Sequence, residues 1–215
     1  MKGFIISEFL GLEAGWWAVI IAAAGLLAYV IDLILRKRAE SKRQQSLIER
    51  VRALELKAEP TPLVIQIGTL PSIPEDAEEI VTEADELLEA GASIDAAALI
   101  KIGNIAFPKS DYKKAEHYYR VALDQAEHSK RLDLVAAALG NMGLVYQVKG
   151  DLDVALKHHK EALKIHHAIG YRQGEAIDLG NMGLISKAKG NLDEARRCQK
   201  ASLKIDREIG SRKGE

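Results

Sequence analysis

The most informative feature of the sequence is a pattern of apolar and polar positions that recurs every forty residues in its second half. Residues 139–152 read LGNMGLVYQVKGDL and residues 179–192 read LGNMGLISKAKGNL, and a looser copy surrounds Leu99 and Gly103. Self-similarity at a fixed period of this length is typical of solenoids, in which each unit packs on its neighbours. The pattern therefore predicts an all-α chain of stacked helix pairs.

Each unit is expected to hold two helices joined by a tight turn. In the middle copy apolar residues recur at helical spacing across 139–146, which predicts one buried face. Gly150 is suited to end that helix, and Asp151 to cap the next one. The second helix repeats small residues at fixed places, and we expect Gly143 to touch Ala155. With the glycines aligned, the units span 96–135, 136–175 and 176–215.

This pattern resembles the tetratricopeptide repeat, in its forty-residue form with a lengthened second helix. The resemblance covers 96–215 and implies a right-handed α-solenoid of three helix-turn-helix repeats, whose first helices line a concave groove that holds a protein or peptide. Two features depart from the family pattern. Pro108 stands where a helix should continue, and His159 and Gln199 occupy the place of the aromatic ring of Tyr119.

The groove implied by the resemblance has polar candidates on the face away from the packing stripe. They are Lys101, Asn104, Asn141, Gln147, Asn181 and Lys187. Asparagine amides both donate and accept hydrogen bonds, which suits contact with the backbone of an extended peptide. The alternative is that Asn141 and Asn181 cap or bridge neighbouring helices. Both interpretations are open at this point.

An apolar run from residue 14 to residue 35 is long enough to cross a membrane as a single helix. Trp16 and Trp17 lie at one end, and the other end continues into Arg36, Lys37 and Arg38, so both ends carry side chains suited to a membrane interface. The positive charge after the run predicts that residues 1–13 lie outside and the C-terminal repeats in the cytoplasm. A cleaved signal peptide would instead carry its charge before a shorter run. Asp32 is expected to pair with Arg36, one turn away.

Residues 36–58 predict a basic, helical membrane-proximal stalk, with eight Lys/Arg against three Asp/Glu over 36–57. Its apolar positions form a short heptad seam of Leu47, Val51, Leu54 and Ala58. The seam is compatible with a short parallel coiled coil or with a solvated stalk. Four prolines then make 59–74 a linker. Residues 75–95 hold nine acids and no base, and predict an acidic helix that caps the first repeat through Ile80, Ala84, Leu87 and Leu88.

The candidate chemistry is sparse, and we expect no enzymatic activity, cofactor or metal. Four histidines share one helix: His158, His159, His166 and His167. Their useful separations of seven and eight residues are too long for one ion, which favours a solvated or half-buried histidine face. Cys198, the single cysteine, excludes an intrachain disulfide, and solvent screening argues against a thiol activated by its basic neighbours. Charges spread around the repeats, with few aromatic residues, argue against nucleic-acid binding.

These observations predict a membrane-anchored scaffold or adaptor, which binds a protein or peptide partner for complex assembly or for recruitment to the membrane. The alternative is the regulatory or sensor portion of a larger enzyme or signalling protein with its effector beyond residue 215. Self-association through the stalk or the open last repeat is also expected. At that end the apolar residues are Ala201, Leu203, Ile205 and Ile209.

Overall fold

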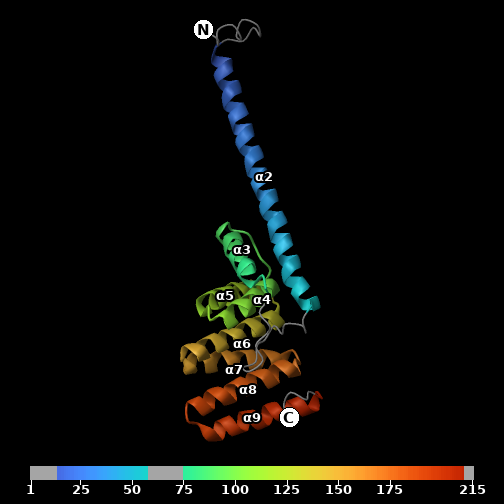
Figure 1. Ribbon diagram of the computed structural model, residues 1–215, viewed down its shortest axis with the longest axis vertical. Helices are drawn as coiled ribbons and strands as arrows, with labels where there is room; N and C mark the ends of the chain where they lie inside the picture. Colours follow the sequence, from blue (N-terminus) through green and yellow to red (C-terminus); the bar gives the residue numbers. More distant parts are fainter. Residues whose placement is uncertain (1–13, 58–74, 211–215) are drawn as a thin grey trace. The chain divides into compact units, whose positions relative to one another are not determined.

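The computed structural model describes residues 14–57 and 75–210, and confirms the all-α class. The chain divides into two units, residues 1–45 and 46–215, each considered by itself. The helices are α2 (Ala14–Lys57), α3 (Ala77–Glu89), α4 (Ala96–Ala106), α5 (Tyr112–His128), α6 (Leu132–Lys149), α7 (Leu152–Ala168), α8 (Arg172–Ala188) and α9 (Leu192–Glu208) (Figure 1).

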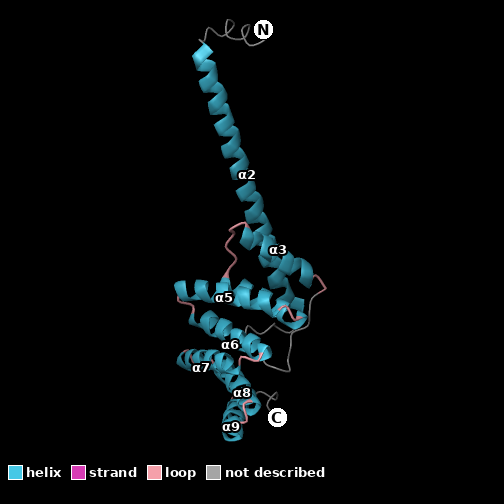
Figure 2. Cartoon of the chain, turned by 90° about the vertical axis from the view of Figure 1, so that its left-hand side faces the viewer, coloured by secondary structure: helices cyan, strands magenta, loops and turns pink. Residues whose placement is uncertain are grey.

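The second unit is a stack of helical hairpins, consistent with a solenoid. The pairs α4/α5, α6/α7 and α8/α9 follow one another, each helix packed on the next (Figure 2). Helices α6 and α8 begin at Leu132 and Arg172, four residues before the predicted unit boundaries at 136 and 176. The preceding helices end where Lys130 and Gly170 adopt positive φ values of 55° and 72°. These left-handed positions, and not the start of the apolar pattern, set the boundaries between repeats.

Helix α3 is built like the second helix of a repeat. Its Ala77 and Ala84 are fully buried at the same seven-residue spacing as Ala115 and Ala122 of α5. It packs against α4, and the hydroxyl of Tyr118 donates to the Val81 carbonyl oxygen at 3.0 Å. The predicted acidic helix therefore contributes a small-residue face to the solenoid.

The C-terminal part of α2, from Ser46, belongs to the same unit and packs within it. Leu47 and Val51 have exposed fractions of 0% and 1% and lie in the core cluster that includes α3. The Arg50 guanidinium binds the carboxylates of Glu83 at 2.8 Å and Asp76 at 3.0 Å. The heptad seam is thus used inside the chain, and is neither a coiled-coil interface nor a solvated surface at these two positions. The side chains of the other two seam residues lie outside the described part.

The first unit contains the N-terminal part of α2. Asp32 and Arg36 form the expected pair at 2.8 Å. Over the residues that the structure describes, none of the helices has an apolar stretch long enough to cross a membrane. Of the predicted span, the side chains of residues 14–24, Trp16 and Trp17 included, lie outside the described part, as do residues 1–13 and the linker 59–74.

Each repeat brings a glycine of its first helix against the side chain of its second. A Cβ at Gly103 would lie 2.4 Å from the Tyr119 ring, and a Cβ at Gly143 would lie 2.7 Å from Nε2 of His159. The nearest atoms to Gly143 belong to the ring of His159 and not to Ala155, so the missing side chain makes room for this ring. In the third repeat a Cβ at Gly183 would lie 3.4 Å from the Ala195 carbonyl oxygen, so there the glycine also lets two helices approach closely.

The first hairpin accommodates its proline in the turn. Helix α4 ends at Ala106, and Phe107–Lys109 form a single 3₁₀ turn before Ser110 at φ 63°. The ring of Phe107 is buried and meets Tyr112 edge-on, with 5.4 Å between ring centroids. The proline shortens α4 without removing the hairpin.

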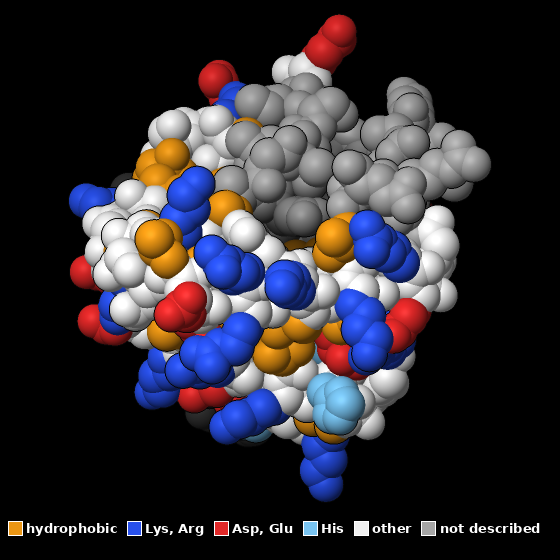
Figure 3. Space-filling model, turned by 90° about the horizontal axis from the view of Figure 1, so that it is seen from below, with side chains coloured by type: hydrophobic (Ala, Val, Ile, Leu, Met, Phe, Trp, Pro, Cys, Tyr) orange, Lys and Arg blue, Asp and Glu red, His pale blue; other side chains and the backbone are white. Residues whose placement is uncertain are grey.

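The face of α9 that closes the stack is more polar than predicted. Ile205 is buried, and of the four expected apolar residues only Ile209 is exposed. Viewed from this end, Lys and Arg side chains are prominent and hydrophobic ones are scattered (Figure 3). Exposed basic residues of α9 are Arg196, Arg197, Lys200, Lys204 and Arg207. Ala201 and Leu203 are half-buried, so the predicted apolar residues of this helix are partly accessible and lie among basic side chains.

Candidate peptide-binding groove

The first helices of the repeats form one row, in which α6 contacts both α4 and α8. All twelve residues from Leu134 to Val145 are buried, so this part of α6 has no face open to solvent. The predicted groove residues lie on these three helices. The structure separates them into a buried asparagine set and a more exposed set at the helix ends.

The three predicted asparagines are all fully buried. The Tyr119 hydroxyl and the Asn141 amide both donate to Oδ1 of Asn104, each at 2.9 Å. Burial raises the pKa of Tyr119 well above its ordinary value, so this hydroxyl keeps its proton and remains a donor. Asn141 thus bridges α6 to α4, which agrees with the structural interpretation of this residue.

Asn181 differs from Asn141 although it occupies the same position one repeat later. Neither its Nδ2 nor its Oδ1 has a hydrogen-bond partner in the described part of the chain. The position that corresponds to Asn104 in this repeat is Leu144, which offers no acceptor. A buried amide without partners costs about 1–3 kcal/mol per group. Such groups are rare in folded proteins and call for an explanation.

The remaining predicted residues lie nearer the surface. Lys101 and Gln147 are half-buried, and Lys187 is exposed. Oε1 of Gln147 is a second buried acceptor without a partner among the described residues. Beside Asn181, Gly180 and Leu184 are half-buried, so the row is more open at α8 than at α6.

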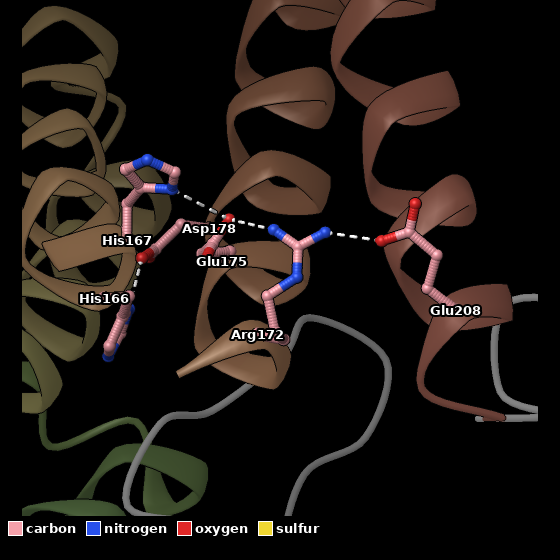
Figure 4. Close-up of polar contacts among 6 residues, drawn as sticks. All are labelled: His166, His167, Arg172, Glu175, Asp178 and Glu208. Atoms are coloured by element: carbon pink, nitrogen blue, oxygen red, sulfur yellow. Dashed lines mark hydrogen bonds and ion pairs between the residues drawn. The ribbon is translucent and has the colours of Figure 1, made fainter. Parts of the chain in front are cut away.

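A buried histidine–carboxylate cluster joins α7 to α8 and was not expected from the sequence. Oδ1 of Asp178 lies 3.1 Å from Nδ1 of His159. Its Oδ2 lies 2.8 Å from Nδ1 of His166 (Figure 4). All three side chains have exposed fractions of 0–1%. The predicted solvated or half-buried histidine face is therefore wrong for these two residues. The available signal was Asp178, an acid at a position that is Ala138 in the preceding repeat.

A second polar group links α8 to both of its neighbours at the surface. The Arg172 guanidinium binds Glu175 at 2.7 Å and Glu208 of α9 at 2.6 Å, and His167 of α7 lies 3.5 Å from Glu175 (Figure 4). These carboxylates, Glu208 above all, raise the pKa of Arg172. The group orients the start of α8 between α7 and α9.

The sequence offered two further candidates for chemistry, a reactive thiol at Cys198 and a metal site. Burial, with Glu194 nearby, raises the pKa of the Cys198 thiol and disfavours the thiolate. No group of three or more His, Cys, Asp or Glu side chains within 14–57 and 75–210 is arranged to hold a metal ion.

Comparison with known families adds one finding. Residues 134–208 match the tetratricopeptide repeat. No curated protein matches the chain. The match runs from the first turn of α6 to the end of α9, and together with the all-helical architecture it supports a tetratricopeptide-repeat protein. Tetratricopeptide repeats generally mediate protein–protein interactions and scaffolding.

Proposed function

We propose that the repeats bind an extended peptide segment of a protein partner along the row of α4, α6 and α8. The observation that carries this proposal is the buried, unpartnered amide of Asn181. A peptide backbone presents one donor and one acceptor per residue, which is what this amide lacks. Gln147 offers a further acceptor beside it, and Lys187 a positive charge at the end of α8.

The three repeats do not take equal parts in this function. Asn141 already bonds to Asn104, so a ligand at α6 competes with a bond inside the protein. At α8 no such bond has to be broken. Partner recognition is therefore centred on α8, with the α4–α6 pair as its rigid support.

We also propose that residues 14–35 attach the module to a membrane, with the repeats on the cytoplasmic side. The sequence supports this through the apolar run and the basic residues Arg36, Lys37 and Arg38 that follow it. Eight large apolar side chains between Leu26 and Leu35 are 40–66% exposed, and such a surface requires an apolar environment. The module would then act as an adaptor that recruits its partner to the membrane.

The test of the binding site is selection of peptides from a display library on the full chain, followed by affinity measurement on variants. Loss of one hydrogen bond of about 0.5–1.5 kcal/mol predicts that Asn181→Ala weakens selected peptides about 2- to 12-fold. Asn191→Ala, at the exposed start of α9, is the matched control and should leave affinity unchanged. Equal affinity of wild type and Asn181→Ala for all selected peptides would contradict the proposal.

A further inference from the structure

The joint between the second and third repeats is chemically unlike the joint before it. Where α7 meets α8, three fully buried positions hold His159, His166 and Asp178. Forty residues earlier, where α5 meets α6, the same positions hold Tyr119, Ala126 and Ala138, and all are fully buried. One joint is therefore apolar and the other contains a carboxylate between two imidazoles.

The geometry commits both imidazoles to this carboxylate. Each presents Nδ1 to a different oxygen of Asp178, at 3.1 and 2.8 Å, so each must carry its proton on Nδ1 to donate. Gly174 admits the His166 ring, because a Cβ there would lie 2.7 Å from it. Gly143 admits the ring of His159 in the same way.

The cluster tolerates one added proton better than two. One proton on an imidazole forms a neutral ion pair with Asp178, whereas two leave a net positive charge in a buried site. Nε2 of His159 is buried without a partner among the described residues, so a proton placed there finds no acceptor. In an opened joint water reaches both imidazoles, and each can then carry a proton without the cost of burying its charge.

Other titratable groups face the cluster from four helices. On α8 they are Tyr171, Arg172 and Glu175, on α7 His158 and His167, on α6 Tyr146 and on α9 Glu208. Glu175 and Glu208 share the one guanidinium of Arg172, which leaves this group a net charge of −1 beside His167. Tyr171 meets the edge of the His166 ring. Burial lowers the pKa of His158, which stacks on Tyr146 and so adds no positive charge to the site near neutral pH.

We propose that the α7–α8 joint is a proton-sensitive hinge, which docks the third repeat firmly near neutral pH and loosens it below about pH 6. In acid the opened state then binds up to one proton more than the docked state, so a fall in pH favours opening. The effect on ligand binding rests on the proposed groove, because Asn181 lies on α8, which contacts the helix α6 that carries Asn141. Loosening would separate the two asparagines and release a bound peptide.

The test is hydrogen exchange of the full chain between pH 5 and pH 8, corrected for the intrinsic rate at each pH. A docked joint that holds one proton and an opened joint that can hold two differ by a full proton only well below the ordinary imidazole pKa of about 6.5, so protection of α8 and α9 should fall about sixfold between pH 7 and pH 5. Protection of α4 and α5 should change far less. Uniform behaviour of the four helices in the wild type would overturn the proposal, with no variant needed.

The residues of the α5–α6 joint can be placed in the α7–α8 joint to make a control variant. The variant H159Y/H166A/D178A installs its three residues, and its α8 and α9 should keep the same protection at pH 5 and pH 7. His167→Ala removes an exposed imidazole on the same helix and should preserve the wild-type profile. A profile abolished by His167→Ala, or retained by the triple variant, would contradict the assignment. No ligand enters this measurement, so its result is independent of whether the groove binds peptides.

Discussion

The amide of Asn141 donates to Oδ1 of Asn104 at 2.9 Å, whereas Asn181, its equivalent one repeat later, has Leu144 at the corresponding position and no hydrogen-bond partner among the described residues. The two asparagines should therefore respond differently to truncation. Asn141→Ala removes a buried hydrogen bond and should lower the free energy of unfolding by about 1 kcal/mol. Asn181→Ala removes only unpartnered groups and should leave stability unchanged or raised. Urea denaturation of the full chain measures both, and equal destabilisation would show that Asn181 also has a structural bond.

The glycines of the first helices should also differ from one another in how strongly their substitution by alanine lowers stability. Gly103→Ala and Gly143→Ala place a Cβ within 2.4–2.7 Å of a buried ring, and overpacking of this kind costs about 1–3 kcal/mol. At Gly183 the nearest atom is Cγ of Gln199 at 3.1 Å, on an exposed and flexible side chain. Gly183→Ala should change the denaturation midpoint little. Three equal losses would mean that the ring contacts do not set the spacing.

The sequence predicted the fold correctly where the repeats are regular. The prediction failed at positions where one repeat carries a different residue from the others. The helical hairpins could be predicted from the glycines and apolar residues that recur every forty residues, because equivalent positions in each repeat then lie on the same helix face. The Gly143–His159 contact did not follow, because a histidine at a position that Tyr119 fills could point to solvent or into the core. Only the neighbouring helix, which brings Asp178 toward it, decides between these orientations.

The helices that carry the proposed groove residues could be predicted, but the hydrogen bonds of these residues could not. Helical spacing places Asn104, Asn141 and Asn181 on the first helices. Whether each amide is satisfied depends on the residue across the row, which is a polar one for Asn141 and Leu144 for Asn181. The seam of α2 shows the same limit, because its spacing does not reveal that Leu47 packs inside its own chain.

The contact of α2 with the solenoid should be energetically strong. Leu47→Ala truncates a fully buried side chain and should cost about 2–5 kcal/mol. Leu35→Ala, on the same helix but 57% exposed, is the control and should have little effect on unfolding of the repeats. Hydrogen exchange of 46–57 reports the result locally, and unchanged protection in Leu47→Ala would contradict this packing.

The ion pair between α5 and α6 predicts a pH dependence that is separate from the histidine cluster. Lys149 and the Tyr146 hydroxyl hold the pKa of Glu116 below its ordinary value. A lowered carboxyl pKa contributes stability above the ordinary glutamate range, and this is lost as pH falls through the lowered pKa. Glu116→Gln should therefore destabilise by about 1 kcal/mol at pH 7 and by less at pH 3, below the ordinary glutamate range.

The control for this ion pair is Glu127→Gln, an exposed carboxyl on the same helix, which should change stability at neither pH. Denaturation curves at both pH values separate the two variants. A Glu116→Gln effect of equal size at pH 3 would show that packing, and not charge, explains it.

The proposed membrane topology predicts protection of the repeats from outside. Protease added to intact cells should leave 59–215 uncut, and the same protease should digest it after the membrane is opened. Digestion in intact cells would reverse the orientation, because the basic residues after the apolar run would then face outward.

The central claim is that the unpartnered amide of Asn181 contacts the partner's backbone, and side-chain NMR of asparagine amides tests it most directly. The Asn181 resonances are assigned by their loss in Asn181→Ala and followed as a selected peptide is added. We expect them to shift and to gain protection from solvent exchange, while the resonances of Asn191 remain unchanged. Saturating peptide that leaves the Asn181 resonances in place would contradict the account.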